Sequence, residues 1–197
     1  MERRPWNRNI HYHDVVLNAV PPNCRRALDI GCGDGRLAAR LAERCGEVVA
    51  IDVHAPTLAR ARTTHASKNL TFVEADVMRH PFEDAGFDCI TSIATLHHLP
   101  LVAALERISR LLRPGGVLAL IGLYRLRTPA DFVWAHAAMP VSWWFRVTKT
   151  FEEVAAPMRE PDETLGEIRR TVAAVLPGAV VTRRLLFRYS VLWRRPS

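Results

Sequence analysis

Seven residues, Asp29 to Gly35, place three glycines at alternate positions between a short apolar run and an amphipathic stretch. Their sequence is D-I-G-C-G-D-G. Glycine is needed where a ligand must approach the backbone closely or where φ is positive. Where a strand passes into a helix, such a loop would clear a channel and present free N–H groups at the helix start. Because tight turns seldom need three glycines, we favour a ligand site over a plain turn.

Two carboxylates follow the next two apolar runs. Asp52 ends the run EVVAID, 21 residues after Gly31, where it is placed to accept hydrogen bonds from two ribose hydroxyls. Asp76 ends the run FVEAD, where it can accept from an adenine amino group while Val77 packs on the ring. The alternatives are a helix N-cap for Asp52 and an ordinary surface loop for Asp76. Together with the glycines, the two residues indicate a nucleoside site.

The glycine spacing discriminates between classes of nucleotide. A dinucleotide-binding G-x-G-x-x-G pattern would require glycine at the position of Arg36. No G-x-x-x-x-G-K-[ST] phosphate loop is present in the sequence. The pattern D-x-G-x-G-x-G therefore argues against plain NAD binding and against a nucleoside triphosphatase.

Two adjacent histidines, His97 and His98, follow the fourth apolar run. An imidazole with an ordinary pKa of about 6.5 suits a general base near neutral pH. The alternative is that one caps the next helix and the other packs beside a ligand. We take both as the candidate catalytic residues.

The elements that must position these residues alternate along the chain. The hydrophobic pattern predicts strands at 25–31, 47–53, 70–77, 87–96 and 116–124, and helices at 35–45, 55–66, 100–116 and 162–176. Such alternation predicts right-handed βαβ units, and hence a doubly wound, mostly parallel sheet in an α/β fold. The tail 179–195 reads as two strands joined tightly near residues 188–190, which must be antiparallel. The total is about seven strands.

Composition limits the class of protein. The 197 residues, 49% hydrophobic and 24% charged, predict a single globular domain, 1–197, rather than a disordered or fibrous chain. We find no membrane-spanning run, no signal peptide and no CxxC pair, which favours a soluble cytoplasmic protein without a metal site. The net charge of +7 comes mainly from scattered arginines, so we expect a solvated basic face rather than a nucleic-acid partner.

These motifs, taken in order, resemble a known family. ALDIGCGDG, AIDV, FVEADV, FDCITSIATLHHL and LLRPGGVLALIG are similar to the successive motifs of class I S-adenosylmethionine-dependent methyltransferases, in particular the small, single-domain, type 11-like group. The likeness covers roughly residues 26–122, and the antiparallel strand pair at the end matches as well. It implies a Rossmann-like fold, S-adenosyl-L-methionine as cofactor and S-adenosyl-L-homocysteine as product.

The resemblance also implies roles for individual residues. Asp29 would orient the amino group of the cofactor, Asp52 the ribose hydroxyls and Asp76 the adenine amine. Gly31 and Gly33 would approach the methionine and ribose, and the backbone of Ile93 and Ala94 would lie near the methionine. Segments before the first strand usually close over the cofactor, which nominates His11, Tyr12 and His13. The full set of expected cofactor-binding residues is Tyr12, Asp29, Gly31, Cys32, Gly33, Gly35, Asp52, Val53, Asp76, Val77, Ile93 and Ala94.

We expect methyl transfer to a small organic acceptor by in-line displacement. Orientation of the reactants can supply roughly 7–11 kcal/mol of barrier lowering, so desolvation and positioning suffice as the main mechanism. Residues 1–25 are interpreted as an N-terminal cap segment and the aromatic-rich residues 124–161 as a substrate-lid insertion, or else as ordinary helix packing. The alternatives are action on RNA or protein through Arg-rich faces, a nucleotide-binding oxidoreductase, and a non-catalytic cofactor binder. The oligomeric state stays open.

Overall fold

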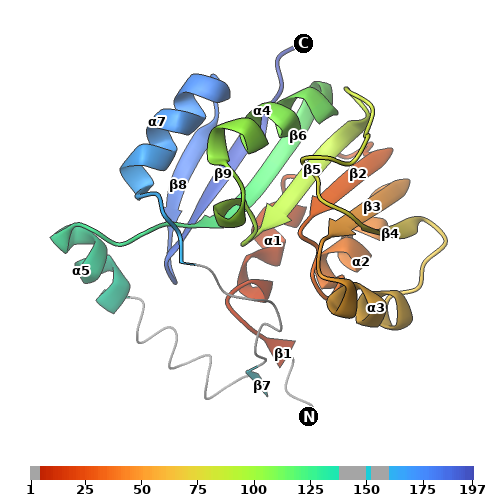
Figure 1. Ribbon diagram of the computed structural model, residues 1–197, viewed down its shortest axis with the longest axis horizontal. Coiled ribbons are helices and arrows are strands. Elements are labelled where there is room, and N and C mark those ends of the chain that lie inside the picture. Colours follow the sequence, from red (N-terminus) through yellow and green to blue (C-terminus); the bar gives the residue numbers. More distant parts are fainter. Residues whose placement is uncertain (1–4, 138–149, 152–159) are drawn as a thin grey trace.

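A seven-stranded sheet forms the centre of the molecule, with strand order β4-β3-β2-β5-β6-β9-β8 (Figure 1). The computed structural model describes residues 5–137, 150–151 and 160–197. The parallel strands are β2 (Arg26–Ile30), β3 (Glu47–Asp52), β4 (Leu70–Glu74), β5 (Phe87–Ile93) and β6 (Leu112–Leu123). The strand β9 (Arg188–Arg194) runs antiparallel to both β6 and β8 (Val180–Arg184). The expected doubly wound, mostly parallel α/β fold is confirmed.

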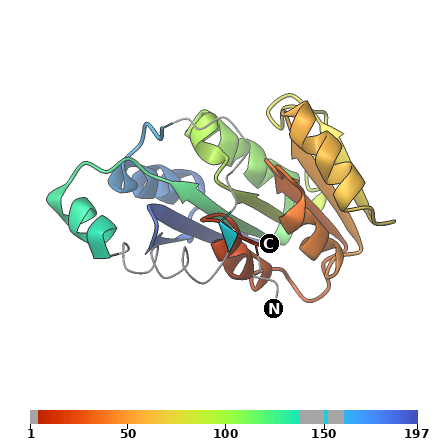
Figure 2. The same cartoon turned by 90° about the horizontal axis from the view of Figure 1, so that it is seen from below.

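Helices cover both faces of this sheet and divide its core in two. On one face α4 (Leu101–Leu111) and α7 (Leu165–Val175) pack on alternate residues of the strands. On the other face lie α1 (His13–Leu17), α2 (Arg36–Ala42) and α3 (Ala55–Thr64). Figure 2 shows α1 on the opposite side of β9 from α7. No helix among the residues that the structure describes is long and apolar enough to cross a membrane.

Local sequence explains the two helices that cover the first face. In α4 the buried side chains Leu101, Leu105 and Ile108 recur at helical spacing and give the helix one apolar side. In α7, Thr164 accepts a hydrogen bond from the Glu167 amide while the Glu167 carboxylate accepts from the Thr164 amide. This capping box fixes the start of the helix at the residue after Thr164.

Two expected boundaries are wrong. The turn between the last strands spans 185–187 rather than 188–190, and Leu186 and Phe187 adopt positive φ values of 57° and 62° there. Leu186 is 1% exposed and packs with Trp6, so an apolar residue occupies a turn where the sequence reads as strand. The strand β6 begins at Leu112 rather than at 116, because Leu112 pairs with Phe87 before a register shift in β5.

The segment 124–161 is described only in part. Its helix α5 (Pro129–Ala137) is anchored to β8, since Asp131 Oδ1 accepts from Arg183 at 2.7 Å and Trp134 Nε1 donates to the Arg184 carbonyl at 3.1 Å. Further on, β7 (Thr150–Phe151) pairs in parallel with β1 (Pro5–Trp6). Residues 138–149 and 152–159 of the expected lid, which include Trp143, Trp144 and Phe145, lie outside the described residues.

The pairing of β6 with β9 depends on a glycine. Gly122 lies opposite Tyr189, and a Cβ at position 122 would overlap the Tyr189 ring. Tyr189 is only 2% exposed, so its ring has little space to move away. We expect Gly122→Ala to lower the free energy of unfolding by about 1–3 kcal/mol, the usual cost of overpacking, in urea denaturation. The matched control is Gly166→Ala in α7, where the nearest atom to a new Cβ is 3.8 Å away and no loss is expected. Equal stabilities for the two variants would contradict the packing account.

Candidate functional site

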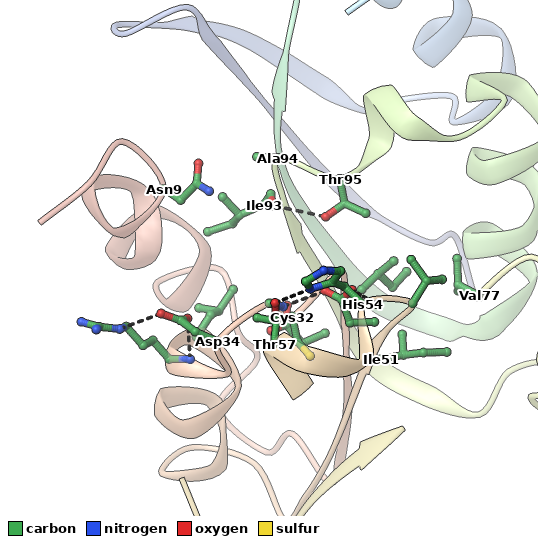
Figure 3. Close-up of a pocket in the computed structure, with 18 of the residues that line it drawn as sticks. Asn9, Cys32, Asp34, Ile51, His54, Thr57, Val77, Ile93, Ala94 and Thr95 are labelled. Atoms are coloured by element: carbon green, nitrogen blue, oxygen red, sulfur yellow. Dashed lines mark hydrogen bonds and ion pairs between the residues drawn. The ribbon is translucent and has the colours of Figure 1, made fainter. Parts of the chain in front are cut away.

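A cavity of about 750 Å³ lies at the carboxyl ends of the parallel strands (Figure 3). In an open α/β sheet this edge is the binding crevice, at the point where the strand order reverses. The residues that the sequence nominated and the structure brings to the cavity are Asp29, Gly31, Cys32, Gly33, Asp52, Val53, Asp76, Val77, Ile93, Ala94, His13 and His98. It does not bring His11, Tyr12, Gly35 or His97 into the cavity wall.

The glycine loop is held by its own chain. The amides of Gly31 and Cys32 donate to the Ile51 carbonyl at 2.8 and 3.1 Å, and the Gly33 amide donates to Asp52 Oδ2 at 2.8 Å. The Gly35 amide donates to the Cys32 carbonyl at 3.0 Å. These four loop amides are therefore bonded within the chain, whereas the expectation of free N–H groups concerned the start of α2, at Arg36 and the residues after it. The donors of the four amides are used to fix the shape of the loop.

Space, rather than free amides, explains the glycines. Gly31 has a φ of 70°, and a Cβ there would overlap the Thr95 side chain. Gly33 has a φ of 53°, and a Cβ there would meet no atom within 4 Å. Gly31 thus lets two loops come together, whereas Gly33 leaves open space beside the backbone. Gly35 instead packs toward Phe72, where a Cβ would lie 2.8 Å from the ring.

Asp52 and Asp76 stand at the ends of neighbouring strands. Besides binding the Gly33 amide, Asp52 accepts from the His54 amide through Oδ1 at 2.9 Å. Asp76 Oδ1 accepts from the Met78 amide at 2.9 Å. A carboxylate has about four acceptor positions, so both keep acceptor capacity after these backbone bonds. Each side chain is thus oriented by its own loop and still able to accept from a hydroxyl or an amine.

Asp29 is the buried acid of the site, with 1% of its surface exposed. Its Oδ1 accepts from Thr91 Oγ1 at 2.8 Å, while Oδ2 has no hydrogen-bond partner within the described part of the chain. Burial raises the pKa of this carboxyl to about 7, and the nearby Asp52 adds to the rise while the Thr91 hydroxyl opposes it. A buried acceptor without a donor is costly, which indicates that a cationic ligand group completes the site.

The turn after β5 forms the next wall of the cavity. Ala94 adopts a φ of 56°, unusual for a residue with a Cβ, and its amide donates to the Ile121 carbonyl at 2.7 Å. Strained backbone of this kind costs on the order of 1–3 kcal/mol and is concentrated at functional sites. Ile93, Ala94 and Thr95 follow one another along this wall in Figure 3.

The N-terminal segment closes the cavity with residues that the sequence analysis missed. Asn7, Asn9 and Ile10 all line it. Asn7 Oδ1 accepts from the amides of Asn9 and Ile10, both at 2.9 Å, so it shapes the turn before the short 3₁₀ helix η1 (Ile10–Tyr12). The available signal was the pair of asparagines just before a helix, since asparagine favours such turns.

The side chains of His11, Tyr12 and His13, which the sequence nominated, lie in different surroundings. His13 lines the cavity, and its burial lowers the pKa of the imidazole to about 4, with Arg40 adding to the effect, so the ring is neutral. Tyr12 is 4% exposed, and its hydroxyl donates to the Leu185 carbonyl at 2.6 Å. Tyr12 therefore ties the segment to the turn before β9. The His11 ring packs edge-on against Tyr12.

Histidine and cysteine chemistry at the site is limited. His98 lines the cavity from the 3₁₀ helix η2 (Leu96–His98), whereas His97 stacks beside it with ring centroids 4.1 Å apart. Burial raises the pKa of the Cys32 thiol, so the thiol stays protonated at neutral pH and is no nucleophile. Among the described residues no three His, Cys, Asp or Glu side chains come together as metal ligands.

Comparison with known proteins agrees with this geometry. Residues 28–120 match a family model described as a methyltransferase domain. An uncharacterized methyltransferase of Mycobacterium tuberculosis is 41% identical over 198 residues, covering 98% of each chain. A demethylmenaquinone methyltransferase of Roseiflexus castenholzii is 36% identical over 118 residues, 58% of this chain and 50% of that protein. The structure of the N-methyltransferase NodS from Bradyrhizobium japonicum with S-adenosyl-L-homocysteine superposes with a TM-score of 0.62 at 16% identity, over 95% of this chain and 87% of that one.

The hydrogen-bond acceptors of the cavity fit the donors of S-adenosylmethionine. That molecule carries an ammonium group, two ribose hydroxyls and an adenine amine, and all of them donate hydrogen bonds. The cavity offers Asp29 with an unpartnered buried oxygen, then Asp52 and Asp76 on the next two strands. The carboxylates therefore come in the order in which the cofactor presents its donors.

Asp52 provides the first test. We expect Asp52→Ala to weaken binding of S-adenosylhomocysteine at least tenfold, because each hydrogen bond to a charged group contributes about 1.5–3 kcal/mol. Calorimetry gives the affinity, and circular dichroism checks the fold, since Asp52 also holds the Gly33 amide. Asp84→Ala, which removes an exposed carboxylate paired with Arg107, is the control and should bind normally. Unchanged affinity in Asp52→Ala would rule out the ribose assignment.

The raised pKa of Asp29 predicts that the affinity for S-adenosylhomocysteine depends on pH. Because its pKa is about 7 when no ligand is bound, only the ionised form binds an ammonium group well. Affinity for S-adenosylhomocysteine should rise as pH increases to about 7, level off above it, and fall roughly tenfold per pH unit below it. Asp29→Asn should bind weakly and without this dependence. Calorimetry across the range decides, and a flat profile for the native protein would contradict the role of Asp29.

Proposed function

The chain belongs to the class I S-adenosylmethionine-dependent methyltransferases, and we propose that it methylates a small organic acceptor bound beside the cofactor. Membership in this family excludes two alternatives from the sequence analysis, a nucleotide-binding oxidoreductase and a non-catalytic cofactor binder. When bound, S-adenosylmethionine supplies a methyl group activated by a positively charged sulfur. The chain's own part is to bind, to orient and to exclude water.

The observation that carries the proposal is the extent of the cavity. Asp29, Asp52 and Asp76 occupy its part over β2, β3 and β4, while Asn9, Ile10, Thr95, His98 and Leu99 line the remainder. Its volume of about 750 Å³ falls within the range of small-molecule sites, roughly 300–1,000 Å³. One continuous space thus supports a cofactor and a small acceptor side by side. The relative named for demethylmenaquinone, an organic molecule, is in keeping with this.

Positioning and desolvation form the proposed mechanism. Ile10, Ile93 and Leu99 give the acceptor part apolar walls that displace water. The strained turn at Ala94 is fixed by its bond to the Ile121 carbonyl, so the wall holds its shape. Holding two reactants in one geometry can supply roughly 7–11 kcal/mol, so the proposal needs no dedicated base.

Three of the arginines that could serve an RNA or protein acceptor are engaged within the chain. Arg113 bonds Asp88 at 2.8 Å, Arg194 donates to the Gly115 carbonyl at 2.8 Å, and Arg195 donates to the Ser109 carbonyl at 3.1 Å. Their guanidinium groups therefore support loops at the far edge of the sheet from the cavity. These three side chains are committed to the fold, which disfavours a nucleic-acid surface at that edge of the sheet.

The acceptor class is testable directly. The protein is incubated with methyl-labelled S-adenosylmethionine and a bacterial extract separated into small molecules, RNA and protein. We expect label in the small-molecule fraction, with S-adenosylhomocysteine formed in equal amount. Label recovered chiefly in RNA or protein would overturn the proposal, and Asp52→Ala serves as the inactive control.

The histidines test for a general base. We expect His98→Ala, at the cavity, and His97→Ala, outside it, each to lower the labelling rate less than tenfold with unchanged affinity for S-adenosylhomocysteine. A general base contributes about 10²–10⁴-fold, so a loss of that size in His98→Ala alone would identify His98 as the base. The measurement is the initial rate with the labelled small-molecule fraction at saturating cofactor.

A further inference from the structure

Arg188 is a buried cation that the proposed mechanism does not use. It is 6% exposed and is the first residue of β9, opposite Leu123 at the end of β6. Because β9 is antiparallel to β6, this end of β9 lies at the same edge of the sheet as the cavity. A guanidinium at this place is removed from water at the margin of a ligand site.

The side chain of Arg188 is incompletely satisfied. Its Nη2 donates to Asn9 Oδ1 at 2.7 Å, while its Nε is buried without a hydrogen-bond partner within the described ranges. None of the ion pairs found among those residues includes Arg188, although a guanidinium offers five donors. Burial, together with the charge of Arg8, lowers the pKa of Arg188 to about 10, which leaves it charged at neutral pH. A buried charge without a counterion is costly and calls for an anion.

Neighbouring groups add to the positive charge. Arg184 lies directly opposite Arg188 in the β8–β9 ladder. Like charges at opposite positions destabilise a sheet. Arg8 stacks over the Phe187 ring, 5.7 Å from its centroid, at the turn beside them. Asp131, on the helix α5 that packs beside β8, is bound by Arg183 at 2.7 Å. The described residues therefore concentrate cations here without compensating them.

Asn9 connects this charge to the cavity. It lines the cavity, and Figure 3 shows it across from Ile93 and Ala94. Because its Oδ1 accepts from Arg188, its amide nitrogen is the group left to donate, and hydrogen bonding at one end of an amide strengthens the other. Arg188 thus orients Asn9 as a donor and supplies the charge behind it.

The position of this pair separates it from the cofactor. Asp76, Asp52 and Asp29 follow or end β4, β3 and β2, whereas β9 lies three strands beyond β2 in the sheet. At about 4.8 Å per strand, the lateral offset is roughly 14 Å. The offset applies to the strand of Arg188; that the space next to Asn9 takes the acceptor rather than the methionine end of the cofactor is part of the proposal.

We propose that Asn9 and Arg188 form a subsite for an anionic group, a carboxylate or a phosphate, on the acceptor. Asn9 contacts the group, and Arg188 acts as a positioning residue that also provides the charge. The inference rests on the proposed function, because it assigns this part of the cavity to the acceptor. It narrows the acceptor class to small organic anions.

The test uses the protein saturated with S-adenosylhomocysteine and titrated with butyrate, inorganic phosphate or neutral butyramide at constant ionic strength, with affinity measured by calorimetry. We expect butyrate or phosphate to bind and butyramide not to bind. The better ligand of the two shows whether the subsite takes a carboxylate or a phosphate. Arg188→Met and Asn9→Ala should each weaken that binding at least tenfold. Arg194→Gln, the same loss of charge at the other end of β9, should not.

Three results would overturn the inference. The first is equal binding of butyramide and the anions, or no anion binding at all, by a protein that still binds S-adenosylhomocysteine. The second is unchanged anion affinity in Asn9→Ala, which decides the matter even where Arg188→Met does not fold. The third is a loss in Arg188→Met of affinity for S-adenosylhomocysteine but not for 5′-methylthioadenosine, which lacks the amino-acid part. That pattern would assign the anion to the cofactor's own carboxylate.

The melting temperature of Arg188→Met shows whether Arg188 serves the fold or the ligand. Arg188→Met replaces a buried, unpaired charge by an apolar side chain of similar length, so the melting temperature without ligand should stay equal or rise. A fall in melting temperature with unchanged anion binding would mean that Arg188 serves the fold alone. Failure of the proposed function would look different, as label in RNA or protein with anion binding intact.

Discussion

The reversal of strand order between β2 and β5 is the constraint on which the site depends. From β2 the chain adds β3 and β4 on one side, and from β5 it adds β6 on the other. The loops that leave β2 and β5 therefore diverge and open a crevice at their carboxyl ends. Each further strand on the first side delivers one more carboxylate to this crevice. The spacing of the acids reflects the spacing of strands in a sheet.

Hydrogen bonds within the chain turn this edge into a shaped cavity. Asp52, at the end of β3, accepts a hydrogen bond from the Gly33 amide, so β3 fixes the loop that follows β2. The close approach of Gly31 to Thr95 does the same between the loops after β2 and β5. Loop geometry is thus set before any ligand arrives, which reduces the ordering cost of binding.

Much of the fold and part of the site could be predicted from local sequence. Alternating strands and helices predict where Asp29, Asp52 and Asp76 meet, because carboxyl ends of parallel strands share one edge. The glycine amides could not be predicted, since the acceptor for Gly33 lies 19 residues away on another strand. Tyr12 and Asn9 are harder still, because their partners Leu185 and Arg188 are 173 and 179 residues distant. No local pattern encodes such contacts.

Buried charged groups of opposite sign lie in the cavity and at its margin. The part of the cavity over β2, β3 and β4 holds carboxylates, with a buried acceptor on Asp29 left unsatisfied within the described ranges. At the margin, β9 carries Arg188, whose buried Nε has no hydrogen-bond partner among the residues that the structure describes. Both atoms cost stability in the protein without ligand, and in the proposed complex each would meet a ligand group of the opposite charge. A cationic methyl donor and an anionic acceptor would then be drawn to opposite ends of one space, with the reacting atoms brought together between them. Because Asp29 and Arg188 are both buried, the polarity that orients the proposed pair would also discriminate against neutral acceptors.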